Sequence, residues 1–301
     1  MTLDQLRIFV AVAEREHVTR AAHDLNLTQS ATSAAVAALE ARHATRLFDR
    51  VGRRIVLTDA GRLFLAEARA VLARVAAAEL VLADLSGLKS GSLSLAASQT
   101  AGNYWLPGYL HLYRRLHPSI ELSLEIGNTD KVAALVRDGE ANVGFVEGEV
   151  NLAELSATVV AEDDIVLVAP LGHPWSRLRP DEELDLASAP WVLREAGSGT
   201  RAILMALLRE RGIALSGIEV ALVLPTNETV RAAVEAGAGV TLISRMAVAS
   251  ALAAGRLVAI DRPLPKRRFL MLRHRERYVT AAEREFVGLV TGTEAPPQTR
   301  Q

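Results

Sequence analysis

The 301-residue sequence contains no cysteine, few aromatic residues and no long uninterrupted hydrophobic run. Without cysteine the chain forms no disulfide, no thiolate zinc site and no cysteine nucleophile, which fits a reducing compartment. The stretch from Met1 to Val18 carries five charged side chains and so does not resemble a signal peptide. No run approaches the length that crosses a bilayer. We therefore expect a cytoplasmic protein with no membrane attachment.

The chain also lacks a large net charge, since its formal charge at pH 7 is only −1. The distribution of charge is more informative than the sum. Between Arg42 and Arg62 lie six arginines against two acids, Asp49 and Asp59. The six are Arg42, Arg46, Arg50, Arg53, Arg54 and Arg62. Such an excess suits a surface that meets phosphates, but a solvated surface can have the same composition, so residue pattern must decide.

Three short helices are predicted at the start of the chain. The first covers residues 3–14, where apolar residues recur at helical spacing. Thr19 is expected to cap a second helix through Leu25, and Leu27 to fill the corner that follows. In the turn, Asn26 tolerates the left-handed conformation. Two short helices joined by a three-residue turn and supported by a preceding helix predict a helix-turn-helix.

The second helix of that pair is expected to read DNA. Thr28 should cap it, and it should run from Gln29 to about Ala41 with Val36 and Leu39 facing inward. Glutamine bonds bidentately to adenine, while serine and threonine reach base edges or phosphates. The candidate DNA-binding residues at its start, expected to point away from the core, are Thr28, Gln29, Ser30, Thr32 and Ser33.

The following segment, residues 47–58, predicts a hairpin-like wing. Phe48 would anchor it to the core and Gly52 would turn it. Arg50, Arg53 and Arg54 would then straddle a phosphate backbone. Without the preceding helices, the same segment would be an unremarkable basic turn.

A long helix is predicted from Thr58 onward, ending at a hinge over residues 87–91. Its apolar residues alternate in steps of four and three, which predicts a seam of three heptads. The seam consists of Phe64, Ala68, Val71, Val75, Ala78, Leu82 and Leu85. Such a stripe can pack on its own domain or on a partner helix. We favour a partner helix from a second chain, because a dimer also spans two half-sites on DNA.

Four motifs resemble the LysR-type transcriptional regulator family. They are the runs at residues 25–33 (LNLTQSATS), 38–40 (ALE), 47–50 (LFDR) and 57–61 (LTDAG). The resemblance covers essentially the whole chain. It implies a winged helix-turn-helix head, a homotetramer built from dimers, binding to interrupted palindromes in promoter DNA, and a response to a small co-inducer. RNA polymerase is a candidate further partner.

The sequence departs from the family pattern at three alanines. Ala34 and Ala35 replace a basic residue and a glutamine that are common in the family, so Gln29, Ser33 and the wing arginines would carry more of the contact with DNA. Ala44 stands where the family often has glycine. An alanine there must adopt a costly left-handed conformation, or the turn must differ.

After Gly91 the pattern changes to strands alternating with helices, which predicts largely parallel sheets covered by helices. The expected fold is therefore α/β, preceded by a winged helix-turn-helix and a linker helix. The resemblance to the family implies that the effector domain has two lobes similar to those of periplasmic binding proteins. The expected domains are 1–58 for DNA binding, 59–90 for the dimerisation helix and hinge, and 91–301 for the effector domain. Its first lobe takes about 91–161 and 266–301 and its second about 162–265, with the chain crossing near residues 162 and 265.

Ligands in such folds bind beyond the carboxyl ends of strands, between the lobes. Three polar loops and the start of a later helix fit that position. The candidate effector-binding residues are Ser98, Thr100, Asn128, Thr129, Ser198, Gly199, Thr200 and Asn227. Free N–H groups at a helix start suit an anion, and the resemblance implies an anionic effector for the glycine-serine-glycine-threonine turn. Plain helix capping is the alternative for Ser98, Thr129 and Ser198, and Asn227 could line the cleft or cap a helix.

Two other classes of function are weighed against a regulator. An enzyme is not favoured, because the seven histidines show no metal-ligand spacing and no nucleophile elbow, phosphate loop or dinucleotide fingerprint occurs. We therefore expect no catalytic residue, no metal site and no cofactor. An exported solute-binding protein would lack the helix-turn-helix. The expected function is DNA-binding regulation in which an anion changes the closure of the two lobes.

Overall fold

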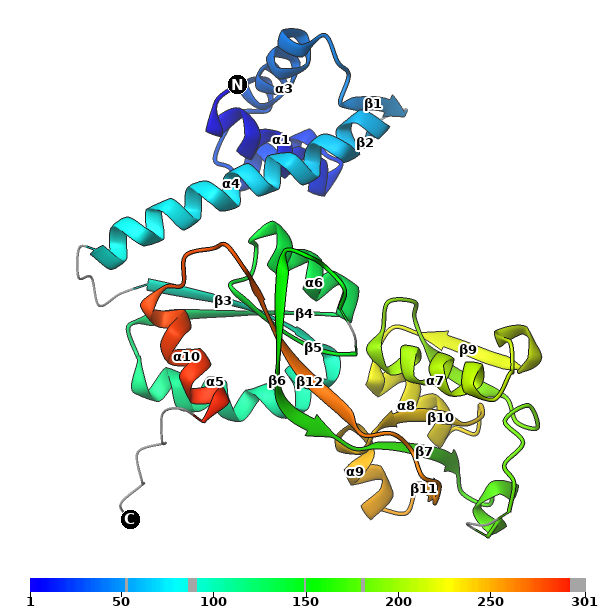
Figure 1. Ribbon diagram of the computed structural model, residues 1–301. Coiled ribbons are helices and arrows are strands. Elements are labelled where there is room, and N and C mark those ends of the chain that lie inside the picture. The colour runs from blue at the N-terminus through cyan, green and yellow to red at the C-terminus, as the bar shows by residue number, and fades with distance from the viewer. Residues whose placement is uncertain (52–53, 86–90, 149, 180–181, 293–301) are drawn as a thin grey trace. The chain divides into compact units, whose positions relative to one another are not determined.

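The structure, a computed structural model, describes residues 1–301 except 52–53, 86–90, 149, 180–181 and 293–301 (Figure 1). It divides into two compact units, one formed by residues 1–87 with 138–140 and the other by the rest of the chain. Among the described residues, no helix is long and apolar enough to cross a membrane.

The first unit is a three-helix core with a two-stranded wing and a long helix. Its elements are α1 (Leu3–Arg15), α2 (Val18–Asp24), α3 (Gln29–His43), β1 (Phe48–Val51), β2 (Arg54–Leu57) and α4 (Asp59–Leu85). Phe9 is fully buried, and its ring lies 5.4 Å from the ring of Phe48 and 4.9 Å from that of Phe64. This aromatic cluster joins α1, the wing and α4, so Phe48 anchors the wing as predicted.

The helix boundaries follow local capping chemistry. Thr28 caps α3 as predicted, because its hydroxyl accepts a hydrogen bond from the N–H of Ala31 (3.1 Å). Thr19 does not cap α2; instead Nδ1 of His17 accepts from the N–H of Arg20 (3.4 Å), so α2 begins two residues earlier than predicted. Leu27 does not fill the corner either, since it is 41% exposed. Asn26 has φ +54°, which confirms the predicted left-handed turn.

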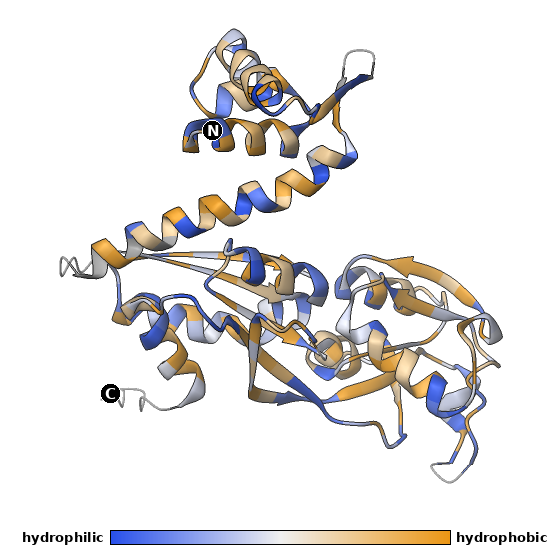
Figure 2. Ribbon diagram, turned by 45° about the horizontal axis from the view of Figure 1, so that its top comes forward, coloured by the Kyte–Doolittle hydropathy of each residue, from blue (hydrophilic) through white to orange (hydrophobic). Residues whose placement is uncertain are grey.

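The seam on α4 is covered over its first part by the same unit. Phe64 packs on Phe9, and Ala68 is 1% exposed within the core of the first unit. For these two residues the expectation of a partner helix is wrong, because α1 covers them. Val71 and Leu82 are 40% and 68% exposed. In Figure 2, hydrophobic and hydrophilic residues alternate along α4. The side chain of Leu85 lies outside the described residues.

The second unit contains two lobes, each with a central sheet. The first sheet has the strand order β4-β3-β5-β12-β6. Its strands are β3 (Gly91–Ser98), β4 (Ile120–Gly127), β5 (Val143–Glu147), β6 (Leu155–Asp163) and β12 (Arg267–His274). Its helices are η1 (Ala101–Trp105, a π-helix), α5 (Leu106–Leu116), α6 (Thr129–Asp138) and α10 (Ala281–Thr291). The rings of Phe145, Phe269 and Phe286 lie in its core beside α10.

The second lobe is built from the sheets β10-β7-β11 and β8-β9, which a bridge between Trp191 and Val240 connects. Its strands are β7 (Ile165–Pro170), β8 (Trp191–Arg194), β9 (Val220–Leu224), β10 (Thr241–Ser244) and β11 (Leu257–Ile260). Its helices are η2 (Pro174–Arg177), α7 (Gly199–Glu210), η3 (Leu215–Gly217), α8 (Asn227–Glu235) and α9 (Arg245–Ala253). Trp191 is fully buried at its centre.

The chain passes between the lobes twice. β6 ends in the first sheet at Asp163 and β7 begins in the second at Ile165, while β11 ends at Ile260 and β12 begins at Arg267. The expectation of largely parallel sheets is only half right. β3 pairs in parallel with β4 and β5, but β12 runs antiparallel to β5 and β6. β6 and β12 run in opposite directions because β6 leaves the first lobe and β12 returns to it.

Candidate functional site

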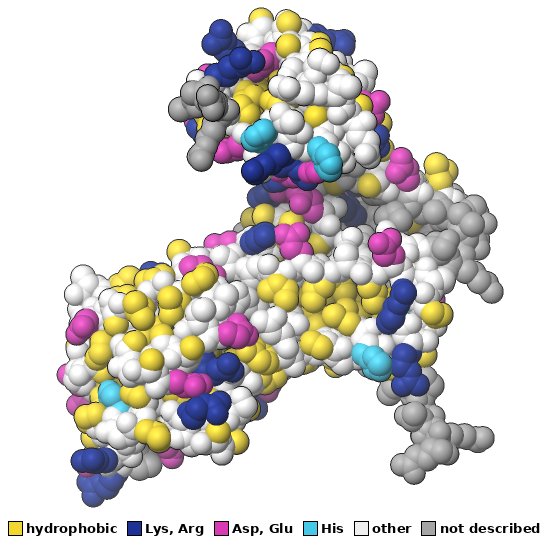
Figure 3. Space-filling view, turned by 180° about the vertical axis from the view of Figure 1, so that it is seen from behind, with side chains coloured by type: hydrophobic (Ala, Val, Ile, Leu, Met, Phe, Trp, Pro, Cys, Tyr) yellow, Lys and Arg dark blue, Asp and Glu magenta, His cyan; other side chains and the backbone are white. Residues whose placement is uncertain are grey.

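The start of α3 presents the predicted DNA-reading residues to solvent. Thr28, Gln29 and Ser30 are exposed, and Ser33 is half-buried on the same helix. On the wing, Arg50 is exposed, while Arg53 and the side chain of Arg54 lie outside the described residues. Arginine side chains gather beside the wing in Figure 3. This surface combines a polar helix start with cations, as a major-groove reader requires.

Thr32 is an exception to this arrangement. It is fully buried, and its hydroxyl donates a hydrogen bond to the carbonyl of Thr28 (3.1 Å). The expectation that Thr32 points away from the core is therefore wrong. One turn of α3 carries it onto the same face as Val36, so it packs against the core of the first unit.

The two lobes of the second unit meet around one arginine, Arg267, the first residue of β12. Its side chain is 2% exposed, and its Nε donates to the carboxylate of Asp163 at 2.9 Å. The hydroxyl of Ser244 donates to the same carboxylate at 2.7 Å. Arg267 also donates to the hydroxyl oxygens of Thr200 (3.0 Å) and Thr100 (3.4 Å), which come from different lobes.

A second chain of hydrogen bonds leads from Thr100 into the second lobe. The side-chain amide of Asn227 donates to the hydroxyl of Thr100 at 3.1 Å, and its oxygen accepts from Arg194 at 2.7 Å. Asn227 does not cap α8, because Thr226 does so by accepting from the N–H of Thr229. Of the two alternatives for Asn227, the structure therefore supports contact across the cleft.

Two buried polar atoms beside this network have no hydrogen-bond partner among the described residues. They are the hydroxyl of Ser98 and Oε1 of Glu147. Ser98 is 2% exposed and caps no helix. Oε1 of Glu147 lies 3.9 Å from Nη2 of Arg267, so Arg267 faces two carboxylates. Unpaired buried polar groups are rare in proteins, and each is a candidate contact for a ligand.

The N-terminus of α7 lies against the same network. Ser198 precedes the helix without capping it, and no side chain in the described part of the structure bonds to the first N–H groups of α7. A Cβ atom at Gly199 would lie 2.2 Å from the carbonyl oxygen of Glu147, so only glycine permits this approach of the two lobes. Of the predicted residues, Thr100, Thr200 and Asn227 are thus joined in one network at the start of α7, and Ser98 lies two residues before Thr100.

Asn128 and Thr129 support the neighbouring loops. The amide of Asn128 donates to the carbonyl of Ala196 in the other lobe (3.3 Å) and accepts from the N–H of Lys131. The hydroxyl of Thr129 donates to the carbonyl of Glu147 at 2.9 Å. These bonds occupy the side-chain groups that a ligand would otherwise contact. The two residues therefore position the loops that contain them.

A further contact between the lobes joins η1 to α8. The hydroxyl of Tyr104 donates to Oε1 of Glu228 at 2.6 Å, and Asn103 donates to the same oxygen at 3.2 Å. Burial and this hydrogen bond raise the pKa of Tyr104. Burial alone would raise the pKa of Glu228, but the hydrogen bonds that its carboxylate accepts outweigh burial and lower it. The bond therefore stabilises the ionised carboxylate.

Sequence reasoning missed Arg267, Asp163 and Glu147. A partial signal was present: Glu147 ends an otherwise apolar run, and Asp163 and Arg267 stand next to the predicted chain crossings. Charges at such positions are usually solvated, and only the three-dimensional pairing shows that these are buried.

Comparison with known proteins agrees with this architecture. Residues 3–62 match the model for the bacterial regulatory helix-turn-helix protein, lysR family, and residues 86–294 match that for the LysR substrate binding domain. The chain is 36% identical over 289 residues to the uncharacterized HTH-type transcriptional regulator YeiE of Escherichia coli K12, covering 95% of this chain and 96% of that protein.

Two solved structures share the fold. Full-length CbnR complexed with its target DNA has a TM-score of 0.68 and 22% identity, over 98% of this chain and 100% of that chain. The regulatory domain of Synechocystis PCC6803 CcmR in complex with 2-PG has a TM-score of 0.62 and 23% identity, over 70% of this chain and 99% of that chain. The relatives and the matched families are transcriptional regulators, not enzymes. The chain belongs to the LysR family of transcriptional regulators.

Proposed function

We propose that this regulator binds promoter DNA in the cytoplasm as a homodimer that assembles into a dimer of dimers, and that a small anion in the cleft between the lobes controls it. The exposed part of the α4 seam, Val71 and Leu82, supports the dimer. RNA polymerase is a candidate further partner. The structural relatives are consistent with this proposal, because CbnR was solved with DNA and CcmR with 2-PG.

The convergence of Thr100, Thr200 and Ser98 beside the start of α7 is the observation that carries the proposal. The hydroxyl oxygens of Thr100 and Thr200 already accept hydrogen bonds from Arg267, so the proton of each hydroxyl remains available to an acceptor. Ser98 and the first N–H groups of α7 are further unpaired donors. Several donors aimed at one place favour an anion.

The charges in the cleft restrict which anion fits. Arg267 is shared between Asp163 and Glu147, so these three residues alone contribute one excess negative charge. A ligand must therefore be compensated by hydroxyl and N–H donors more than by a free cation. We infer a small anion with few charges. Its binding can change the lobes only if it has different affinities for their two arrangements.

Thermal unfolding of the full chain with sulfate, phosphate, 2-PG and a panel of small carboxylates tests this assignment. A ligand at a hundred times its Kd stabilises the protein by about 2.7 kcal/mol. The shift should be lost in Thr100→Val and Thr200→Val and kept in Thr158→Val, whose side chain is exposed on β6. The same ligand should change protection of a promoter fragment. If no anion alters either property, the proposed effector class is wrong.

DNA recognition needs a separate test. Genomic promoter fragments are competed against random duplex at moderate salt, with the full chain as the binder. A regulator selects particular fragments by a large specificity ratio. Equal affinity for all fragments would contradict the proposed function.

A further inference from the structure

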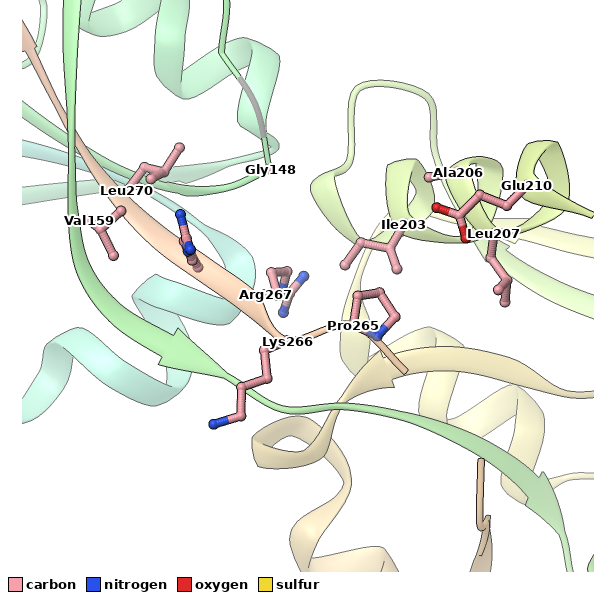
Figure 4. A pocket seen from close by; sticks show the side chains of 11 residues that line it. Gly148, Val159, Ile203, Ala206, Leu207, Glu210, Pro265, Lys266, Arg267 and Leu270 are labelled. Atoms are coloured by element: carbon pink, nitrogen blue, oxygen red, sulfur yellow. The ribbon is translucent and has the colours of Figure 1, made fainter. Parts of the chain in front are cut away.

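A cavity of about 520 Å³ lies between β12 and α7. Figure 4 shows Val159 and Leu270 on the strand side, Ile203 and Leu207 on the helix side with Pro265 beside them, and Arg267 between the two sides. We call this the hinge pocket. Its volume lies within the range that small-molecule sites usually have. Its walls come from both lobes, because β6 and β12 carry the chain out of and into the first lobe and α7 belongs to the second.

The hinge pocket adjoins the buried network between the lobes, because Arg267 belongs to its lining as well. Successive residues on a strand point to opposite faces, so Arg268 and Leu270 share one face while Arg267 and Phe269 share the other. The register places Leu270 opposite Val159 and Arg268 opposite Glu162, with a bulge between Phe269 and Leu270. The bulge bends the pair where it leaves the lobe, and the bent surface forms one wall of the pocket.

The opposite wall is one face of α7. Ile203, Ala206, Leu207 and Glu210 follow the spacing of three and four residues that places side chains on one side of a helix. Three of the four are apolar and half-buried, and Glu210 ends the helix in an exposed position. The body of a molecule bound here would therefore meet aliphatic groups on both walls.

Of the two exposed cations beside the hinge pocket, Lys266 and Arg268, only Lys266 has an acidic partner among the described residues. Lys266 pairs with Glu162 at 3.0 Å, so these two charges compensate one another. Arg268 is exposed and forms no hydrogen bond or ion pair with any part of the chain that the structure describes. A guanidinium binds carboxylate, sulfonate or phosphate oxygens in a bidentate manner. Glu210 on the far wall disfavours a second negative charge.

We propose that the hinge pocket is a second ligand site, which takes a small molecule with an apolar body and a single anionic group. The apolar body lies between Val159 and Leu270 on one side and Ile203 and Leu207 on the other, and the anionic group pairs with Arg268. A ligand held there touches both lobes and biases their relative arrangement. The site shares no hydroxyl donor with the cleft, so its test stands apart from that of the proposed effector.

Fluorescence titration of the full chain with anilinonaphthalene sulfonate tests the charge requirement. This probe has an aromatic body and one negative charge, and phenylnaphthylamine is its uncharged counterpart. Arg268→Gln should weaken sulfonate binding about tenfold and leave the uncharged probe unaffected. Arg209→Gln removes a neighbouring exposed arginine outside the pocket and should change neither. Equal sulfonate affinity in wild type and Arg268→Gln would overturn the proposal.

A second variant tests the pocket itself. Val159 is 48% exposed, so Val159→Trp fills the cavity without disturbing the core, and it should abolish saturable binding of both probes. Leu171→Trp places the same ring on an exposed turn, where the leucine is 66% exposed, and should leave binding intact. Binding that survives in Val159→Trp, or that disappears in Thr200→Val, would place the probe elsewhere and overturn the assignment.

Discussion

Arg267 and Asp163 form an ion pair that the surrounding side chains cover almost completely, with 2% and 1% of the two side chains exposed. The pair stands where β6 leaves the first lobe and β12 enters it. Two charges removed from water in this way are stable only when their hydrogen bonds are satisfied. Ser244, Thr100 and Thr200 supply those bonds from both lobes.

Breaking this pair should be costly. Arg267→Met leaves Asp163 buried without its cation, and we expect a loss of about 3–5 kcal/mol in the free energy of unfolding of the second unit, measured by urea denaturation. The double variant Arg267→Met, Asp163→Leu should recover much of that loss, because it buries no unpaired charge. A single variant as stable as the wild type would show that the pair is solvated.

The contact between Tyr104 and Glu228 should contribute less. Tyr104→Phe removes one hydrogen bond to a partly exposed carboxylate, so we expect a loss of about 1 kcal/mol in the free energy of unfolding at neutral pH. Asn103 retains its own bond to the same oxygen and limits the effect. Tyr109→Phe, on the adjacent helix α5, is the matched control and should cost less, because no hydrogen bond from its hydroxyl occurs among the described residues.

The same contact predicts a pH dependence. The pKa of Glu228 is lowered from its ordinary value of 4.5, so its ionised form is favoured in the folded state. The contribution is therefore fully present above pH 4.5 and is lost as the pH falls through the lowered pKa. The difference in stability between wild type and Tyr104→Phe should shrink between pH 6 and pH 3. A difference that stays constant over that interval would contradict this linkage.

The start of α3 offers a paired test of DNA reading. Gln29→Ala should weaken binding to a selected promoter fragment by about 1–3 kcal/mol and relax the preference at one base pair. Thr32→Val should leave that preference unchanged, because Thr32 faces the core. The affinity of each variant protein for fragments that differ at one base pair shows whether its sequence preference has changed. Loss of specificity in Thr32→Val alone would show that the helix presents a different face.

Replacing Ala44 with glycine should stabilise the first unit. It ends α3 with φ +47°, a conformation that costs an alanine roughly 1–2 kcal/mol and glycine much less. We expect Ala44→Gly to raise the Tm of the first unit, corresponding to about 1 kcal/mol. Ala41→Gly, inside the exposed face of the same helix, should lower it by a similar amount. If Ala44→Gly and Ala41→Gly changed the Tm in the same direction and by the same amount, the backbone at Ala44 would not be strained.

The uncovered half of α4 predicts the contact between subunits. Leu82→Glu should dissociate the dimer in sedimentation experiments, because it places a charge in the exposed heptad seam. Leu63→Glu, at a site that is 75% exposed and outside the seam, should leave the assembly intact. Dissociation by Leu63→Glu and not by Leu82→Glu would locate the interface on another face of the helix.

Local rules predicted those features that local sequence determines. Thr28 caps α3 and Asn26 turns the chain, because capping and left-handed turns depend on one or two residues. The strand around Leu124 follows from a strict alternation of apolar and polar residues, and those around Leu95 and Phe145 follow from short, largely apolar segments. β6 was not predicted, since its residues 156–162 are mostly exposed or half-buried and show no continuous apolar face.

The candidate site was predicted in part for a similar reason. Thr100, Thr200 and Asn227 follow strands or begin helices, and topology alone brings such positions together. The partner that organises them is Arg267, about 167 residues from Thr100 in the chain, and no short-range pattern connects the two. Phe64 and Ala68 show the converse difficulty, because a heptad pattern does not reveal which helix covers it.

Arg267 and Arg268 are consecutive on β12 and both line the hinge pocket, yet the side chain of Arg267 is buried in the network between the lobes and that of Arg268 is exposed. The connection from Ile260 to Arg267 therefore sets which arginine is buried and which is exposed. Inserting or deleting one residue there would exchange the two side chains and every alternate residue after them. The length of that connection is thus a constraint on both the network and the pocket, whatever amino acids compose it.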